Sequence, residues 1–258
     1  MKLFSIHILA TYISGLLLFI FSFPQLTAQE ESVNLTFLRT LEHSREAFTQ
    51  GLVFGSNAVL YESTGQYGRS TLRRIDKQSG QINFIRPIAT NYFSEGITAI
   101  NGKIIMLTWR SGLAFQFDEN SLNLERTFRF DGEGWGLAND GEQLILSDGT
   151  NLLRFYNPEN FQLIKSLRVT ENNVTVVNIN ELEYINGEIW ANIWHQDYII
   201  RIDPMTGEVI GRIYPPEIYP RNLRNRESVF NGIAYDESTR EVYLTGKYWP
   251  NYYIYALN

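Results

Sequence analysis

Side chains that could do chemistry recur along this sequence at intervals of roughly 45 residues. Each of them stands directly before a glycine or, once, a glutamate that opens an apolar stretch: Gln50, Glu95, Trp135, Asn180 and Asn231. They comprise one carboxyl group, three amides and one indole. Such a set can hold a small polar ligand by hydrogen bonds and stacking, and the carboxyl group can move a proton. A hydrated opening lined by polar side chains is the alternative explanation.

Other kinds of chemistry find little support in the sequence. The only histidines are His7, His43 and His195, and the chain contains no cysteine, so the usual zinc sites cannot be assembled. No loop shows the spaced acidic ligands of a calcium site. The sequence also has no Gly-x-Ser-x-Gly nucleophile motif and no glycine-rich phosphate loop. What remains is the position of the recurring side chains.

The segments that must position these side chains repeat as well. Each copy continues with a turn, such as Asn101-Gly102 or Asn186-Gly187, and then with an apolar run, such as Ile104–Leu107 or Ile189–Ile193. A further half-buried stretch of alternating pattern follows each run. A period of this length, built from short strands and hairpin turns, is typical of a β-propeller. The sequence therefore predicts an all-β fold, a five-bladed β-propeller with four antiparallel strands per blade.

The two ends of the chain are expected to close the ring together. Fourth strands are predicted at residues 81–86, 124–130, 161–169 and 209–214, but the fifth repeat ends at Asn258 without one. Residues 34–41 resemble a fourth strand and precede the first repeat. Pairing of this segment with the last blade would remove two exposed sheet edges. The longest irregular stretch, residues 214–228, is predicted to be a surface loop near the rim.

The first 28 residues differ from the rest of the chain. A short basic start is followed by a nearly continuous apolar run over residues 3–24, and Ala28 offers a cleavage site, so residues 1–28 read as a signal peptide. Retention of this segment as a membrane anchor is the alternative. Residues 29–258 are then one catalytic domain, and the protein is expected to be secreted or periplasmic. The net charge of −6 gives no reason to expect a nucleic-acid partner.

Several longer motifs resemble those of the glutaminyl-peptide cyclotransferases of plants and bacteria, whose fold is a five-bladed propeller. The resemblance runs from about Phe37 to the C-terminus and rests on ordered motifs at residues 48–52, 61–68, 93–96, 134–137, 180–187, 190–194 and 245–250. In these enzymes the α-amine of an N-terminal glutamine attacks its own side-chain carboxamide, so that pyroglutamate forms and ammonia leaves. The resemblance therefore implies a reaction that requires no metal ion and no cofactor. Ser94 stands where the family has glycine, which puts only loop detail in doubt.

The resemblance implies roles for particular residues. Glu95 would be the general acid/base, with Phe93 and Trp109 making its surroundings apolar and raising its pKa. Lys247 would donate a hydrogen bond to a substrate oxygen. The remaining site residues would bind the glutamine. Gln50 and Asn180 would hold its amine or amide. Trp109, Trp135 and Trp194 would enclose its side chain, and Phe48 would form part of the pocket wall. Glu95 as a channel ion-pair partner and Lys247 as an exposed strand-end lysine are the alternatives.

The implied partners are peptides or proteins with an N-terminal glutamine, and we expect a monomer with no membrane contact beyond an uncleaved anchor. Two other readings stay open. One is a non-catalytic propeller that binds peptide N-termini, which the presence of both Glu95 and Lys247 disfavours. The other is a sugar-lactone hydrolase propeller, which would show a metal-binding carboxylate and asparagine set and usually six blades.

Overall fold

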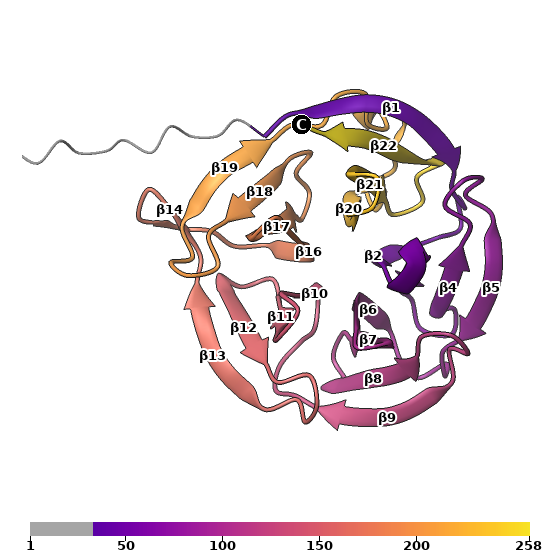
Figure 1. Cartoon of the computed structure of the whole chain (residues 1–258), viewed down its shortest axis with the longest axis vertical. Coiled ribbons are helices and arrows are strands. Elements are labelled where there is room, and N and C mark those ends of the chain that lie inside the picture. The colour runs from indigo at the N-terminus through magenta and orange to yellow at the C-terminus, as the bar shows by residue number, and fades with distance from the viewer. Residues whose placement is uncertain (1–32) are drawn as a thin grey trace, which may run out of the picture. The chain divides into compact units, whose positions relative to one another are not determined.

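The structure is a computed structural model that describes residues 33–258. The predicted signal peptide lies outside the described residues. The described chain contains twenty-two β-strands and two short 3-10 turns, and its four-stranded antiparallel sheets stand around a common centre like the blades of a propeller (Figure 1). No helix in this part of the chain is long and apolar enough to cross a membrane.

Each blade places its first strand at the centre of the ring and its last strand at the outside (Figure 1). The first two blades are β2 (Thr49–Phe54), β3 (Leu60–Thr64), β4 (Thr71–Ile75) and β5 (Ile82–Pro87), then β6 (Ser94–Ile100), β7 (Lys103–Thr108), β8 (Leu113–Asp118) and β9 (Leu124–Arg129). The third and fourth are β10 (Leu137–Asn139), β11 (Leu144–Leu146), β12 (Leu152–Tyr156) and β13 (Leu163–Arg168), then β16 (Ile179–Ile185), β17 (Glu188–Ile193), β18 (Ile199–Ile202) and β19 (Val209–Ile213).

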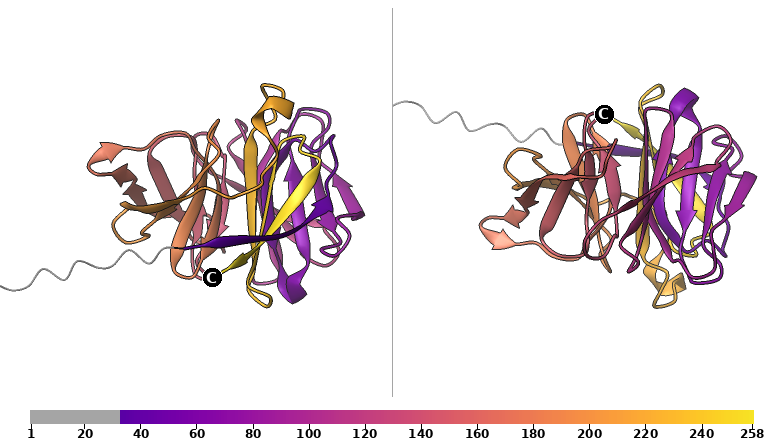
Figure 2. Two further views of the ribbon diagram at one scale, coloured as in Figure 1. Left: turned by 90° about the horizontal axis from the view of Figure 1, so that it is seen from above. Right: turned by 90° about the horizontal axis from the view of Figure 1, so that it is seen from below.

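The fifth blade combines the two ends of the chain, as the sequence predicts. Its inner strands are β20 (Phe230–Asp236), β21 (Glu241–Gly246) and β22 (Asn251–Leu257), and its outer strand is β1 (Leu35–Glu42). Strand β1 pairs antiparallel with β22, from Leu35 opposite Leu257 to Glu42 opposite Asn251. Seen edge-on, β1 lies along the outside of the last blade (Figure 2). This pairing closes the ring and confirms the predicted fold.

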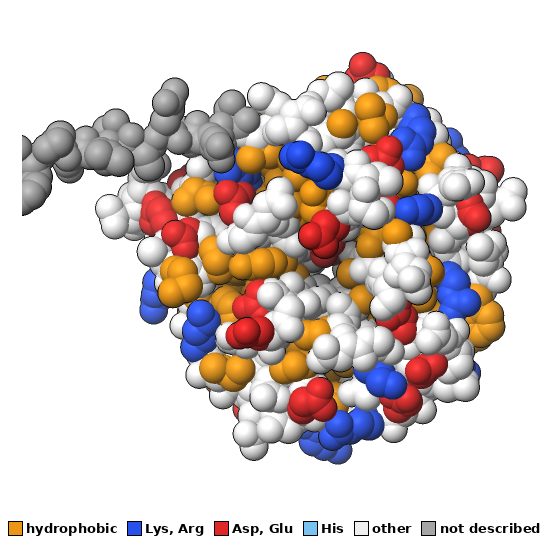
Figure 3. Space-filling view, viewed as in Figure 1, with side chains coloured by type: hydrophobic (Ala, Val, Ile, Leu, Met, Phe, Trp, Pro, Cys, Tyr) orange, Lys and Arg blue, Asp and Glu red, His pale blue; other side chains and the backbone are white. Residues whose placement is uncertain are grey.

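Irregular segments complete the chain. The turn η1 (Ser56–Ala58) follows β2, and η2 (Arg221–Leu223) lies in the predicted loop of residues 214–228, which has no strand. A small hairpin, β14 (Thr170–Glu171) and β15 (Val174–Thr175), precedes the fourth blade and was not predicted. On the face of the ring drawn in Figure 3, acidic and basic side chains are scattered among each other without a broad patch of one sign.

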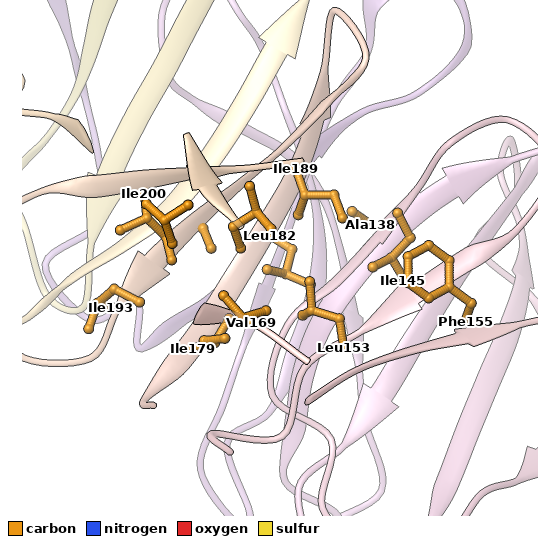
Figure 4. Close-up of a cluster of buried hydrophobic side chains, with 13 residues drawn as sticks. Ala138, Ile145, Leu153, Phe155, Val169, Ile179, Leu182, Ile189, Ile193 and Ile200 are labelled. Carbon is orange, nitrogen blue, oxygen red and sulfur yellow. The ribbon is translucent and has the colours of Figure 1, made fainter. Parts of the chain in front are cut away.

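The core of the protein lies between neighbouring blades. The cluster between the third and fourth blades is built from aliphatic side chains of both sheets, among them Ile145 and Leu153 from one and Leu182 and Ile200 from the other (Figure 4). Successive residues of a strand face opposite sides of the sheet, so Ile145 packs in this cluster whereas Leu144 and Leu146 pack between the second and third blades. Burial of such apolar surface is the main force that holds the blades together.

Glycines let the inner strands approach each other closely. A Cβ atom added to Gly96 would lie 2.5 Å from the backbone nitrogen of Leu137, and one added to Gly136 would lie 2.0 Å from the carbonyl oxygen of Asn180. A side chain at either position would force neighbouring blades apart. The recurring glycine therefore brings the residues directly before it close together at the centre of the ring.

Candidate active site

A cavity of about 550 Å³ opens near the start of the inner strands. This volume is typical of a small-molecule site. The structure brings all nine site residues predicted from the sequence to its walls: Phe48, Gln50, Phe93, Glu95, Trp109, Trp135, Asn180, Trp194 and Lys247. They come from all five blades or from the turns that lead into them. The roles assigned to them stay predictions.

A repeated irregularity in the inner strands places the polar residues of the cavity. The pairing of β2 with β3 shifts register between Thr49 and Gly51, and the pairing of β6 with β7 shifts between Ser94 and Ile97. The same shift occurs between Ile179 and Leu182. Gln50, Glu95 and Asn180 thus lie within bulges, which turn a side chain away from the ordinary alternation of a strand. The bulge explains how buried strands can present polar groups to a cavity.

The fifth member of the recurring set does not line the cavity. Asn231 is fully buried, and its Nδ2 donates to the carbonyl oxygen of Thr49 at 3.0 Å and to Oε1 of Gln50 at 3.4 Å. Of the five recurring residues, Asn231 is therefore the one that does not line the cavity. Its side-chain amide thus links the fifth blade to the first and donates a hydrogen bond to the side chain of Gln50.

Short hydrogen bonds between blades fix the backbone of the site. Ser63 Oγ donates to the carbonyl oxygen of Glu95 at 2.6 Å, and Ser147 Oγ donates to that of Asn180 at 2.6 Å. The amide of Gly96 donates to the carbonyl oxygen of Trp135 at 2.7 Å. At the position that differs from the resembling family, the hydroxyl of Ser94 donates to the carbonyl oxygen of Thr64 at 2.7 Å. The site is thus built on a rigid inner ring.

Aromatic rings form most of the cavity wall. The centroids of Phe93 and Trp109 lie 5.4 Å apart, and those of Trp135 and Trp194 lie 5.8 Å apart in an edge-to-face arrangement. Phe48 lies edge-to-face with Phe93 at 6.0 Å. Trp194 is the most exposed of the site tryptophans at 39%. The other two tryptophans of the chain, Trp190 and Trp249, pack in the core between the fourth and fifth blades.

Glu95 is a buried carboxylic acid without a partner. Only 4% of the residue is exposed, and none of the hydrogen bonds or ion pairs among residues 33–258 includes its carboxylate. Burial raises the pKa of Glu95 well above its ordinary value of 4.5, the charge of Lys247 opposes this rise, and the charge of Glu133 adds to it. The direction agrees with the prediction. The alternative that Glu95 serves as an ion-pair partner finds no support in these contacts.

Lys247 is the buried cation of the cavity. It is only 6% exposed, which contradicts the alternative of an exposed strand-end lysine. Its Nζ lies 4.4 Å from the centroid of the Phe48 ring, a cation–π contact, and has no hydrogen-bond acceptor among the described residues. Burial lowers the pKa of Lys247 to about 8, although the charges of Glu95 and Glu227 act to raise it. Its ammonium group is thus free to donate to a ligand.

The donors that a metal site requires are not gathered at the cavity. In the part of the chain that the structure describes, no three His, Asp or Glu side chains lie close enough together to hold a metal ion. The buried polar side chains at the cavity are one acid, one cation and two amides, and aromatic rings lie beside them. It can bind a small polar group, move one proton and stabilise charge on an oxygen atom.

Five further residues line the cavity and were not predicted: Gln66, His195, Arg226, Glu227 and Val229. Gln66 and His195 adopt left-handed backbone conformations, with φ of 97° and 66°. Arg226 and Glu227 are exposed at the end of the loop of residues 214–228. Sequence analysis used the repeated strands, and these residues belong to turns and a loop that do not repeat. Gln66 lies within the motif at residues 61–68, and this was the signal that could have identified it.

Comparisons with known proteins agree on one family. The sequence profile of the glutamine cyclotransferase family matches residues 13–257. A glutaminyl-peptide cyclotransferase of Arabidopsis thaliana is 37% identical over 215 residues, which is 82% of this chain and 67% of that protein. The crystal structure of Myxococcus xanthus glutaminyl cyclase superimposes with a TM-score of 0.81 at 36% identity, covering 87% of this chain and 96% of that one.

Proposed function

The chain belongs to the glutamine cyclotransferase family, and we propose that it cyclises N-terminal glutamine without a metal ion, using Glu95 as general acid/base. The observation that carries this proposal is the state of Glu95. A buried carboxylic acid with no hydrogen-bond partner among the described residues lines the cavity, together with aromatic rings, amides and the ammonium group of Lys247. Such an acid has lone pairs available for a substrate proton.

Substrate positioning is the first task of the site. The reaction joins two groups of the same residue, so the glutamine side chain must fold back until its carboxamide carbon meets the α-amine. Indole walls from Trp109, Trp135 and Trp194 can hold the folded side chain in one conformation. Gln50 and Asn180 supply amide groups for the amine and the adjacent peptide bond. Holding two reacting groups together in this way accounts for a large part of many enzymatic rate enhancements.

Proton transfer is the second task. The neutral amine nitrogen forms a bond to the carboxamide carbon and gives a proton to the Glu95 carboxylate. Glu95 then gives this proton to the departing amide nitrogen as the carbon–nitrogen bond breaks, so that ammonia leaves and the carboxylate is restored. The balance closes with no external acid or base. The raised pKa of Glu95 suits a group that must both accept and donate near neutral pH.

Charge stabilisation is the third task, and it falls to Lys247. Attack of the amine places negative charge on the carboxamide oxygen. The ammonium group of Lys247 has no acceptor of its own in the described residues and lies in a buried, partly aromatic environment. Its hydrogen bond to the oxygen would therefore be strong. No Lewis acid is needed for these three tasks.

The test is release of ammonia from dipeptides by the purified protein in the presence of a strong chelator. We expect Gln-Ala to yield pyroglutamyl-Ala and ammonia, and Asn-Ala to yield none, because a shorter side chain cannot close the same ring. Turnover lost on chelation and restored by added metal would overturn the metal-free mechanism. Binding of Gln-Ala without turnover would instead support the non-catalytic binding module.

We further propose that the protein is secreted or periplasmic, because the apolar segment at residues 3–24 and the small residue Ala28 have the order of a signal peptide. Mass spectrometry of the protein purified from its natural host tests this. A mature chain that begins at Gln29 would support cleavage, whereas an intact Met1 would support the retained anchor.

A further inference from the structure

Two of the tryptophans in the cavity wall share one hydrogen-bond acceptor behind it. Glu133 does not line the cavity, and it lies in the connection that leads from the second blade into the third. Its Oε2 accepts a hydrogen bond from Nε1 of Trp109 at 2.8 Å and another from Nε1 of Trp135 at 3.0 Å. An indole has a single hydrogen-bond donor, so this one oxygen atom takes the only polar group of both rings.

The second oxygen of Glu133 is held by Arg110. Nε of Arg110 donates to Oε1 of Glu133 at 2.9 Å, and the guanidinium carbon of the same arginine lies 3.8 Å from the centroid of the Trp109 ring. Trp109 is therefore fixed at its edge by Glu133, on one side by Arg110, and against Phe93 by their contact at 5.4 Å. Rotation of the indole would break contacts of all three kinds.

The electrostatics of Glu133 fit an ionised acceptor. Burial acts to raise the pKa of Glu133, but the hydrogen bonds from Trp135, Arg110 and Trp109 and the charge of Arg110 hold it below the ordinary value. Hydrogen bonds to a charged acceptor are stronger than those between neutral groups. An aromatic wall that is already ordered also loses less conformational entropy when a ligand binds.

The charge of Glu133 also reaches Glu95. The charge of Lys247 lowers the pKa of Glu95, and the charge of Glu133 raises it. The charge of Glu227 raises the pKa of Lys247. Geometry and charge can therefore be separated by substitution. Alanine at position 133 removes both acceptor oxygens and the charge, whereas glutamine removes the charge but keeps one acceptor oxygen for the two indoles, with its amide nitrogen in place of the oxygen that accepts from Arg110.

We propose that Glu133 is a positioning residue that fixes the angle of Trp109 and Trp135 around the substrate glutamine, with Arg110 as its anchor. This inference rests on the proposed function, because it assigns these tryptophans to glutamine binding. Glu133 acts through the two indoles and touches no substrate. Its loss should therefore weaken substrate binding before it affects the chemical step.

The experiment compares E133A and E133Q with wild type and with E171A. Glu171 is a matched control because it forms a comparable pair with Arg212, at 2.9 Å from its Nε, and lies outside the cavity.

In E133A we expect KM for Gln-Ala to rise about tenfold, which corresponds to the loss of about one charged hydrogen bond, with a smaller change in kcat. In E133Q we expect KM within about twofold of wild type, and the acid limb of the kcat–pH profile at lower pH. E171A should match wild type.

Tryptophan emission gives a readout that needs no turnover. Loss of the hydrogen bonds to Trp109 and Trp135 in E133A should shift the emission and reduce its quenching by Gln-Ala, while melting temperatures confirm that each variant folds. Emission and KM of E133A that both match E171A would overturn the proposal, and so would a rise of KM in E133Q equal to that in E133A. If wild type shows no turnover, the proposed function fails, and the emission of the variants still decides whether Glu133 orders the two indoles.

Discussion

Two buried glutamates, Glu62 and Glu95, lie on neighbouring blades of this ring and have opposite electrostatics. Glu62 on β3 is fully buried, as Glu95 on β6 nearly is. Burial alone would raise the pKa of Glu62, but the charge and hydrogen bond of His43, the charge of Arg73 and the hydrogen bond of Thr49 hold it below the ordinary value. For Glu95, burial prevails and the pKa rises well above that value.

The partners of Glu62 explain the difference. Its Oε1 lies 2.8 Å from Nε2 of His43 and 2.7 Å from Oγ1 of Thr49, and its Oε2 lies 3.4 Å from Nη1 of Arg73. Nδ1 of His43 donates to the carbonyl oxygen of Trp249 at 2.7 Å. His43 follows the closing strand β1, and Trp249 belongs to the last blade, so this network fastens the ring where its two ends meet.

Burial alone therefore does not determine whether a carboxyl group has a structural or a catalytic role. Glu62 is bound by His43, Thr49 and Arg73 and serves the closure of the ring. Glu95 has no partner among the described residues and keeps its oxygens for a ligand. An unpaired buried acid costs stability, and proteins tolerate such groups mainly at functional sites. Substitutions that remove each group in turn can separate the structural carboxylate from the catalytic one.

Substitution of Glu95 should have the largest effect. E95Q keeps the size of the side chain but cannot carry the proton, so we expect kcat to fall by about 10³-fold, with little change in KM. Steady-state ammonia release measures this. E183Q is the matched control, because Glu183 is also a buried acid, with its pKa raised by burial to about 8, but it accepts from the amide of Tyr235 and does not line the cavity. Equal activity of E95Q and E183Q would contradict the catalytic role.

Removal of the ammonium group of Lys247 should have the second-largest effect on kcat. K247M keeps the length and apolar stem of the side chain and removes the donor, so we expect kcat to fall by about 10²-fold. K165M serves as its control, since Lys165 makes the same kind of cation–π contact, 4.2 Å from the Phe155 ring, outside the cavity. A K247M variant that loses only substrate affinity would show that Lys247 binds the ground state and not the developing oxyanion.

Breaking the closure network should affect stability and leave catalysis intact. E62Q leaves Arg73 and His43 buried without their counter-charge, so we expect a loss of about 3 kcal/mol in the free energy of unfolding. Because the folded-state pKa of Glu62 is depressed, its contribution is present above the unfolded pKa and is lost as pH falls through the folded pKa. Urea unfolding at neutral and acidic pH measures both effects. Destabilisation of E62Q that persists unchanged in acid would contradict this assignment.

The pH dependence of turnover should follow the two cavity residues. Glu95 must be a carboxylate to accept the proton, so kcat should fall as pH drops through its raised pKa. Lys247 must be protonated to donate, so kcat should fall again as pH rises through about 8. We expect a bell-shaped profile whose basic limb disappears in K247M. A basic limb that persists in that variant would assign it to another group.

The sequence predicted the parts of the molecule that repeat. The strand pattern identified five blades and their closure by residues 34–41, observed as Leu35–Glu42, because each blade packs against the next and the same sequence pattern recurs in every blade. The residues before the recurring glycine led to Gln50, Glu95, Trp135 and Asn180. Resemblance to a family supplied the others, since nothing in the pattern alone distinguishes Trp109 from Trp190.

What the sequence could not reveal depends on contacts between distant residues. Asn231 occupies the same place in its repeat as Glu95, yet its amide turns to the carbonyl oxygen of Thr49, and only the packing of two blades decides this. Glu133 and Glu62 look like ordinary acids in the sequence. Their roles arise from partners in other turns and blades, and Arg226 belongs to a loop without a repeating pattern.

Titration of Glu95 and Glu62 would show directly whether the first is an unpaired proton carrier and the second a paired structural acid. NMR of the side-chain carboxyl carbons, with resonances assigned by their absence in E95Q and E62Q, would follow Glu95 and Glu62 in the same sample. We predict that Glu95 titrates well above 4.5 and Glu62 below it. A Glu95 that titrates at or below the pH at which Glu62 does would contradict the account, because its carboxyl group would then be a paired structural acid and not the proton carrier of the cavity.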